Sequence, residues 1–212
     1  MDSLIGTVPD SWAQARLGDV CDILAGPSGA RLALESRTSS NIPVVTPGDL
    51  RNNKIAENGG SAVAPRLADE LSRYRLSSGD VVCSRTGDLG RQALAGKGQE
   101  GWLVGTGCLR LQVRDPISAP YLTYYLGHPA VRDWVNRNAT GSAILSLNTK
   151  TLGLLPVVLP PLAVQSVAVE VLGALDEKIA VYDEISRTTA ALRDSLLPLL
   201  LVGGPRTARR RV

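Results

Sequence analysis

The loop from Arg85 to Arg91 carries the residue types best suited to recognition chemistry. It follows the compact apolar run 81–84 and presents two arginines and Thr86 on either side of its two glycines. An arginine guanidinium is planar and donates two parallel hydrogen bonds to a phosphate or to a guanine edge. We therefore expect this loop to make directed polar contacts.

The overall charge gives this expectation little support by itself. The chain has a net charge of +3, but its last ten residues hold four arginines and no acid, so residues 1–202 carry −1. Arginine supplies 19 of the 23 basic residues, which favours bidentate contacts, although the absence of Phe and the many Ala, Gly and Val residues also fit a codon bias. Any anionic partner must be bound by local clusters, because a uniform positive field is absent.

The residues that usually support catalysis do not form a recognisable set. His128 is the only histidine and precedes Pro129 in an apolar, helix-like context, which favours a structural role. The segment around Lys97 lacks the first glycine and the Ser or Thr of a phosphate loop, and 105–110 lacks the third glycine of a dinucleotide fingerprint. We expect no catalytic residue and no cofactor.

The three cysteines also lack the spacing of metal ligands. Their number is odd, which fits reduced thiols buried as small apolar residues: Cys21, Cys83 and Cys108. No metal site and no disulfide are expected.

Short apolar runs separated by turn residues must position the loop. Strands are predicted at 20–24, 42–45, 81–84, 92–95, 103–113 and 155–159, with short helices at 67–74, on both sides of His128-Pro129, and after a cap at Asn148 or Thr149. This order predicts an α+β fold with a curved, mostly antiparallel sheet and short helices, filling a domain of residues 1–160.

A single long helix is predicted after Pro160-Pro161. Its apolar residues recur in steps of three or four, and its uninterrupted part, 163–197, would span about 50 Å at ~1.5 Å per residue, with Pro198 breaking or kinking the last turn. We expect a coiled-coil helix over 161–201 and a basic, disordered tail over 202–212. The residues predicted to be buried against a second helix are Val171, Leu175, Ile179, Tyr182, Ile185, Leu192 and Leu196.

The chain has no apolar run of the ~18 residues that a membrane helix needs. Its first residues lack the basic and then apolar layout of a signal peptide. A cytoplasmic protein without a membrane contact is expected.

The succession of motifs resembles the specificity subunit of type I restriction-modification enzymes over residues 10 to 200. The motifs are Trp12 with Leu17-Gly18-Asp19-Val20, Ile42-Pro43, Thr46-Pro47-Gly48-Asp49-Leu50, Gly79-Asp80-Val81-Val82-Cys83-Ser84-Arg85-Thr86-Gly87, Gly141-Ser142-Ala143-Ile144, and Leu155 to Leu162 with Gln165. One departure is Val164, where the family commonly has an acid.

The resemblance implies a non-catalytic subunit that reads double-stranded DNA for adenine methyltransferase subunits and, in the full enzyme, for a translocating nuclease subunit. A full-length member has two target recognition domains and two long helices. This chain is similar to half of one, so a homodimer with antiparallel helices would complete it and would read a bipartite, inverted target.

On this interpretation the loops supply the DNA contacts. The expected base or phosphate contacts are Arg85, Thr86, Arg91, Arg31, Arg51, Lys54, Ser142 and Lys150. A second hypothesis is a coiled-coil assembly or regulatory protein that pairs or competes with a full specificity subunit without reading DNA. A hidden nuclease or transferase activity is a third.

Overall fold

The computed structural model describes residues 1–57 and 59–201. The chain forms two compact units, Met1–Val169 and Glu170–Val212. The first unit thus holds the expected recognition domain together with the first turns of the long helix. The predicted disordered tail, 202–212, lies outside the described residues.

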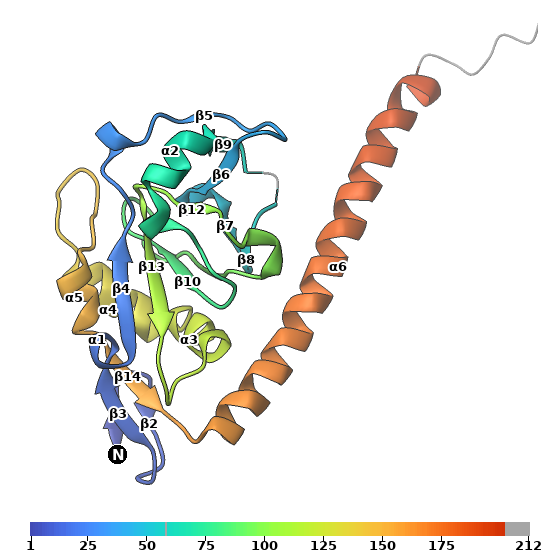
Figure 1. Ribbon diagram of the computed structural model, residues 1–212. Coiled ribbons are helices and arrows are strands. Elements are labelled where there is room, and N and C mark those ends of the chain that lie inside the picture. The colour runs from blue at the N-terminus through green and yellow to red at the C-terminus, as the bar shows by residue number, and fades with distance from the viewer. Residues whose placement is uncertain (58, 202–212) are drawn as a thin grey trace, which may run out of the picture. The chain divides into compact units, whose positions relative to one another are not determined.

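A six-stranded sheet forms the centre of the first unit (Figure 1). Its strands in order are β4 (Cys21–Ala25), β13 (Cys108–Val113), β10 (Val81–Ser84), β11 (Gln92–Leu94), β8 (Asn53–Ile55) and β7 (Leu50–Arg51). Every neighbouring pair is antiparallel except β11 with β8. All four residues of β10 are buried, as expected of an apolar strand in the middle of a sheet.

A second sheet and two small ribbons complete the β structure. The four-stranded sheet has the order β12 (Leu103–Val104), β6 (Ile42–Val45), β9 (Ser61–Val63) and β5 (Glu35–Ser36). The ribbons pair β1 (Asp2–Ser3) with β2 (Gly6–Thr7), and β3 (Ala13–Arg16) with β14 (Pro156–Leu159). The predicted α+β class with a mostly antiparallel sheet is confirmed.

The predicted single strand 103–113 is wrong, because it forms two strands in different sheets. The break falls at 105–107, where the backbone runs close to its neighbours. A Cβ added to Gly105 would lie 2.6 Å from the Val45 oxygen, and one added to Gly26 would lie 1.9 Å from the Gly105 oxygen. Only glycine fits at such a close approach of main chains.

The short helices include the capped helix that the sequence predicts at Asn148 and a second cap, at His128, that it does not predict. They are α1 (Leu17–Val20), α2 (Pro65–Glu70), α3 (Ala119–Leu126), α4 (Pro129–Asn138) and α5 (Thr149–Gly153), with 3-10 turns η1 (Gly29–Arg31), η2 (Pro47–Asp49), η3 (Ser72–Tyr74) and η4 (Lys97–Gln99). The Nδ1 atom of His128 accepts a hydrogen bond from the Ala130 amide, and Asn148 Oδ1 accepts one from the Thr151 amide. Gly127 therefore ends α3, and His128 caps α4.

The main core joins these helices to the large sheet. Leu109 and Leu111 of β13 pack in one cluster with Leu122 of α3 and Val131 of α4, and all four are fully buried. The domain can therefore be stabilised by its own apolar burial.

The long helix α6 runs from Leu162 to Leu201 without interruption. Of the two predicted effects of Pro198, the break is wrong and the kink stays a prediction. A proline removes one backbone hydrogen bond and crowds the preceding turn, and so close to the end few further bonds are at stake. Among residues 1–57 and 59–201, no helix is both long and apolar enough to cross a membrane.

Candidate nucleic-acid interface

The loop 85–91 joins two strands of the large sheet, and hydrogen bonds between Ser84 and Arg91 close its base. It connects β10 to β11, which pair antiparallel. At its base the Ser84 amide donates to the Arg91 oxygen at 2.9 Å, and the Arg91 amide lies 3.3 Å from Ser84 Oγ. Gly87 has φ +76°, a left-handed conformation that favours glycine in the tight part of the loop. The strands therefore fix where the loop begins and ends.

Two other segments hold the backbone of Arg85 from both sides. Its amide donates to the Gly107 oxygen at 2.7 Å, and its own oxygen accepts from the Leu147 amide at 2.8 Å. The Gly87 amide donates to the Leu145 oxygen at 3.0 Å, and Thr86 forms a bridge with Ser146. Arg85 is thus presented from a braced backbone, which reduces the entropy lost when its side chain binds a partner.

Gly107 is where a fourth segment joins this group of loops. A Cβ added there would lie 2.8 Å from Pro47 Cγ and 3.2 Å from Thr86 Oγ1. The turn η2, the 105–107 turn and the loop 85–91 therefore meet at one edge of the domain. The motif 46–50 and the motif 79–87, which are separate in the sequence, are neighbours in space.

The Arg85 guanidinium has an unsatisfied donor at this edge. Its Nε is shielded from solvent and has no hydrogen-bond partner among the described residues, and the same holds for Thr106 Oγ1 on the adjacent turn. Buried polar atoms are normally paired, so the unpaired Arg85 Nε and Thr106 Oγ1 set this edge apart from most of the described domain. Arg85 is therefore the strongest of the predicted contact residues.

Arg91, in contrast, is already paired. Its Nε donates to Asp88 Oδ2 at 2.9 Å, and Asp88 also accepts from the Gly90 amide. The Arg91 hydrogen bond, with the Gly90 amide and the nearby charge of Arg132, lowers the pKa of the Asp88 carboxyl. Asp88 is thus ionised at neutral pH and competes with a phosphate for Arg91.

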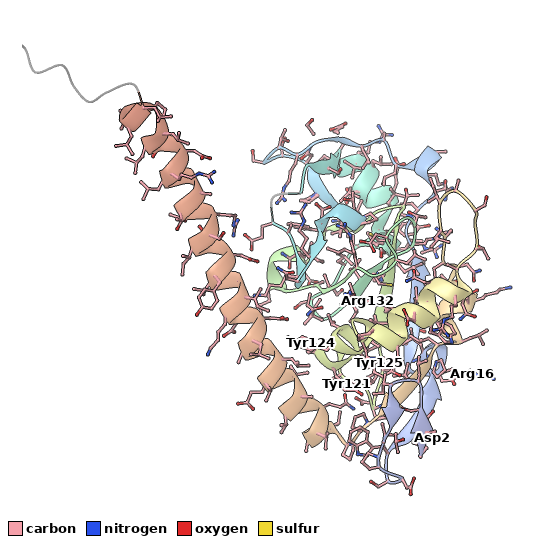
Figure 2. The ribbon with its side chains drawn as sticks, turned by 180° about the vertical axis from the view of Figure 1, so that it is seen from behind. Asp2, Arg16, Tyr121, Tyr124, Tyr125 and Arg132 are labelled. Atoms are coloured by element: carbon pink, nitrogen blue, oxygen red, sulfur yellow. The ribbon has the colours of Figure 1, made fainter. Side chains whose placement is uncertain are left out.

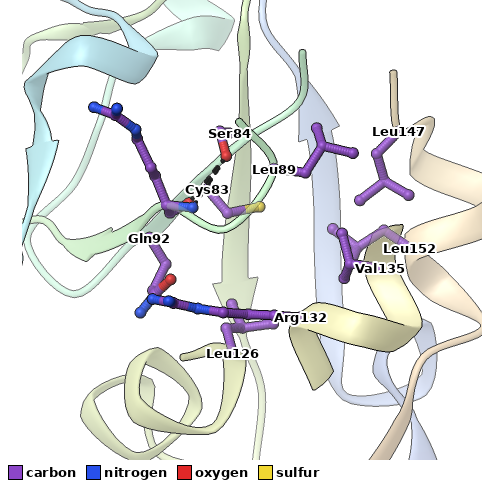
Figure 3. A pocket seen from close by; sticks show the side chains of 10 residues that line it. Cys83, Ser84, Leu89, Gln92, Leu126, Arg132, Val135, Leu147 and Leu152 are labelled. Atoms are coloured by element: carbon purple, nitrogen blue, oxygen red, sulfur yellow. Dashed lines mark hydrogen bonds between the residues drawn. The ribbon is translucent and has the colours of Figure 1, made fainter. Parts of the chain in front are cut away.

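Arg132 on α4 is a residue of this edge that the sequence analysis missed. Its side chain lies 3.6 Å from the position of a Cβ on Gly90, and Figure 2 shows it on the same face of the domain as α3 and α4. Figure 3 shows it beside Leu126 and Gln92, at a hollow of about 20 Å³ beneath the loop. This volume holds roughly one water molecule, so the hollow suits no organic ligand. The exposed guanidinium adds positive charge beside the loop.

The segment 139–147 contacts the loop through Leu145, Ser146 and Leu147, and Lys150 lies on the following helix α5. Thr140 and Ser146 exchange backbone hydrogen bonds and close a short turn around Ser142. Gly141 has φ +111°, and a Cβ there would lie 2.2 Å from the Ile144 oxygen. Ser142 and Lys150 are both exposed.

The remaining predicted residues are exposed on other elements of the domain. Arg51 and Lys54 face each other across the β7–β8 hairpin, whose turn residues Asn52 and Asn53 have φ +49° and +60°. The hairpin is tied to the loop's exit strand by a 3.0 Å hydrogen bond from Gln92 to Asn53. Arg31 ends η1 and is exposed, as are Arg51 and Lys54.

Gln165 fastens the start of α6 to the domain, a role that its motif in the sequence does not reveal. It is fully buried; its Oε1 accepts from the Ser118 amide, and its Nε2 donates to the Pro116 and Pro160 oxygens, all at 2.9 Å. Two α3 tyrosines hold the preceding strand, since Tyr121 donates to the Val158 oxygen and Tyr125 to the Pro156 oxygen. Burial raises the pKa of Tyr121 to about 12. Both hydroxyls thus remain donors at neutral pH.

The residues predicted to lie in a helix seam are all exposed in the single chain. Their exposed fractions range from 39% to 70% for Val171, Leu175, Ile179, Tyr182, Ile185, Leu192 and Leu196. So many exposed large apolar side chains on one helix indicate a surface that binds another element.

The family comparison agrees with this geometry. Residues 9–187 match the model of the type I restriction modification DNA specificity domain, and the chain belongs to this family. The expected resemblance to specificity subunits is confirmed.

Individual relatives are distant and about twice as long. The StySPI type I specificity subunit of Salmonella potsdam is 22% identical over 97% of this chain and 46% of its own length. The solved S subunit of M. genitalium has a TM-score of 0.62 at 14% identity over 94% of this chain, and the HsdS subunit of Thermoanaerobacter tengcongensis has 0.55 at 22% identity over 85%. The matches span 48% and 41% of those two chains. This chain therefore corresponds to about half of the proteins it matches.

Proposed function

We propose that this chain is a sequence-specific DNA-binding specificity subunit that directs DNA methyltransferase subunits to their target. The partly exposed Arg85 on its braced backbone is the observation that carries the proposal. A guanidinium held by a fixed backbone suits bidentate recognition of guanine or of a phosphate.

The contacts are divided between the residues of the loop edge. Arg85 and Thr86 make the base contacts. Arg91 binds a DNA phosphate after it releases the Asp88 carboxylate. The exposed residues around them add phosphate contacts that set the register on the duplex: Arg31, Arg51, Lys54, Ser142, Lys150 and Arg132.

Two copies of the chain complete the subunit. The family model spans the chain once, the matched relatives are about twice as long, and α6 exposes an apolar face. An antiparallel homodimer would bury this face and bring two identical domains to a bipartite, inverted target. The complex acts in the cytoplasm, where the dimer recruits the methyltransferase and, for restriction, the nuclease subunit.

A binding selection tests the proposal. Random duplexes are incubated with the chain, with and without methyltransferase subunit, at near-physiological salt, and the bound DNA is sequenced. The proposal predicts enrichment of a bipartite motif with inverted half-sites. Equal recovery of all sequences in both reactions would refute it.

The second candidate is an assembly protein that pairs through α6 and does not read DNA. The charge of −1 over residues 1–202 favours it. A variant with both Arg85→Ala and Arg91→Ala distinguishes the two functions. A reader of DNA loses its enriched motif, whereas an assembly protein retains its effect on the methyltransferase complex.

A further inference from the structure

The unbroken helix α6 allows its apolar residues to be assigned to a coiled-coil repeat. Alternating steps of four and three residues lead along one face of the helix from Val171 to Leu196. The core positions of this repeat are Val171, Leu175, Lys178, Tyr182, Ile185, Thr189, Leu192 and Leu196. Six of the eight are apolar, and the two exceptions are the polar residues Lys178 and Thr189.

The charged residues of α6 support this assignment. With Leu175 and Tyr182 at position a, and Lys178 and Ile185 at position d, the acids from residue 170 onward fall at the outer positions b, c and f. Arg187 also lies at an outer position and forms an ion pair with Glu184 at 2.7 Å within the chain. Two charged residues lie at or next to the core of the repeat: Lys178 at position d and Arg193 at position e.

We propose that a second copy of this chain covers the seam in one antiparallel register, which Lys178 and Thr189 select. This inference rests on the proposed homodimer and specifies its geometry. In an antiparallel pair each a residue faces a d residue of the partner. The core layers are then Val171 with Leu196, Leu175 with Leu192, Lys178 with Thr189, and Tyr182 with Ile185, each occurring twice about an axis between residues 183 and 184.

Only this register leaves each polar core residue facing a polar one. A shift by one heptad in one direction places Lys178 against Tyr182 and Thr189 against Val171. The opposite shift places Lys178 against Leu196 and Thr189 against Ile185. In the proposed register the Lys178 ammonium can donate a hydrogen bond to the Thr189 hydroxyl, which limits the cost of burying both groups.

A parallel pair is disfavoured by the same lysine. In a parallel, in-register coiled coil each core residue faces its own copy, so two Lys178 ammonium groups would meet in the core. Like charges in a partly desolvated layer repel each other. A single polar core residue is a known means of fixing register and orientation, at some cost in stability.

Disulfide trapping tests the register and keeps the polar layer intact. The full chain is prepared with Leu175→Cys and Leu192→Cys together, and with each change alone, and is oxidised with diamide. On a non-reducing denaturing gel, the double variant should run as a covalent dimer that a reductant converts to monomer. The single variants should run as monomers. Within one chain, positions 175 and 192 are 17 residues apart, about 25 Å at 1.5 Å per residue, too far for an internal disulfide.

The three native cysteines should react little with the oxidant. Cys21, Cys83 and Cys108 are buried. Burial raises the pKa of the Cys21 and Cys83 thiols to about 12, so little thiolate is present at pH 8. The pair Val171→Cys with Leu196→Cys tests a second layer in case the first pair disturbs folding.

A second arm tests the role of the polar layer. A variant with Leu175→Cys and Ile185→Cys should remain uncrosslinked, because these positions face each other only after a heptad shift. Adding Lys178→Leu and Thr189→Leu should raise the melting temperature of the dimer and allow this shifted crosslink to form. Absence of the shifted crosslink in that background would overturn the selective role of the two polar residues.

The possible outcomes separate this inference from the proposed function. Crosslinking of Leu175→Cys alone would show parallel pairing, and a sedimenting dimer without either predicted crosslink would show another register. Both results overturn the inference and leave DNA recognition untouched. A monomer that still enriches a DNA motif overturns the pairing only, whereas a correctly crosslinked dimer without any enriched motif overturns the DNA-reading function only.

Discussion

Leucines on β13 and leucines on the distal part of α6 have the same chemistry and opposite surroundings. Leu109 and Leu111 are fully buried, whereas Leu175 and Leu192 are 52% and 57% exposed. Burying a leucine contributes about 1.5–3 kcal/mol. The domain gains this free energy within one chain, and the helix can gain it only from another surface. Stability of the first unit and assembly through the second should therefore respond to different mutations.

Leu175→Asp is expected to have the largest effect. In the proposed dimer it would remove one apolar side chain from each of two symmetric layers, which should cost at least about 3 kcal/mol, or roughly 100-fold in the dissociation constant. Sedimentation should show a monomer with an unchanged melting temperature for the domain. Ala180→Asp, at an outer position of the same helix, is the matched control and should leave the dimer intact.

Arg85→Ala tests the domain side of the comparison. Losing a bidentate contact should weaken binding to the preferred duplex by about 1–3 kcal/mol, or roughly 5–150-fold, and should relax sequence preference at one position of each half-site. The measurement is a competition titration at fixed salt. Arg16→Ala is the control, because Arg16 is exposed at the end of β3 (Figure 2), in the ribbon with β14 and outside the six-stranded sheet that carries the loop. Equal losses for both variants would contradict the assignment.

Gln165→Ala tests the junction between the two regions. It leaves the Ser118 amide and two carbonyl groups without their buried partner, which should cost about 1–3 kcal/mol in the free energy of unfolding of the domain. Denaturant titration measures this loss. Ser166→Ala is the neighbouring control, since its hydroxyl bonds only the Leu162 oxygen on the exposed helix surface. A neutral Gln165→Ala would show that the start of α6 is held by packing alone.

Asp88→Asn should have the smallest effect and the opposite sign. The exposed carboxylate that pairs with Arg91 is removed, so DNA affinity should rise a few-fold at low salt, and the gain should shrink as salt is added. The lowered pKa of Asp88 gives the same direction with pH. Below that pKa the carboxyl is protonated and the wild-type chain should approach the variant, whereas above it the full difference is present. Weaker binding by Asp88→Asn would show that Asp88 positions Arg91 for DNA.

The sequence predicts well those features that depend on local patterns. The apolar run 81–84, the cap at Asn148 and the helix break at His128-Pro129 are each encoded within a few residues, and all three are confirmed. The split at 105–107 was missed because it depends on close contact with Val45 and Gly26, which are distant in the sequence. Long-range packing of this kind leaves little periodic signal.

The candidate site follows the same division. The loop 85–91 could be selected from its flanking strand and its glycines, and its Arg85 has the unpaired buried Nε. Arg132 was missed because it lies on a helix far along the chain and becomes a neighbour of Gly90 only through tertiary packing. The Asp88–Arg91 ion pair was also missed, although its spacing of three residues could have indicated it.

If α6 holds two DNA-reading domains at a fixed separation, as proposed, a longer helix should widen the gap between the half-sites. Duplicating residues 182–188 preserves the coiled-coil repeat and lengthens the antiparallel pair by about 10 Å at 1.5 Å per residue. Binding-site selection on this variant should return the same half-sites with a gap wider by about three base pairs, at 3.4 Å per step. An unchanged gap would contradict the account.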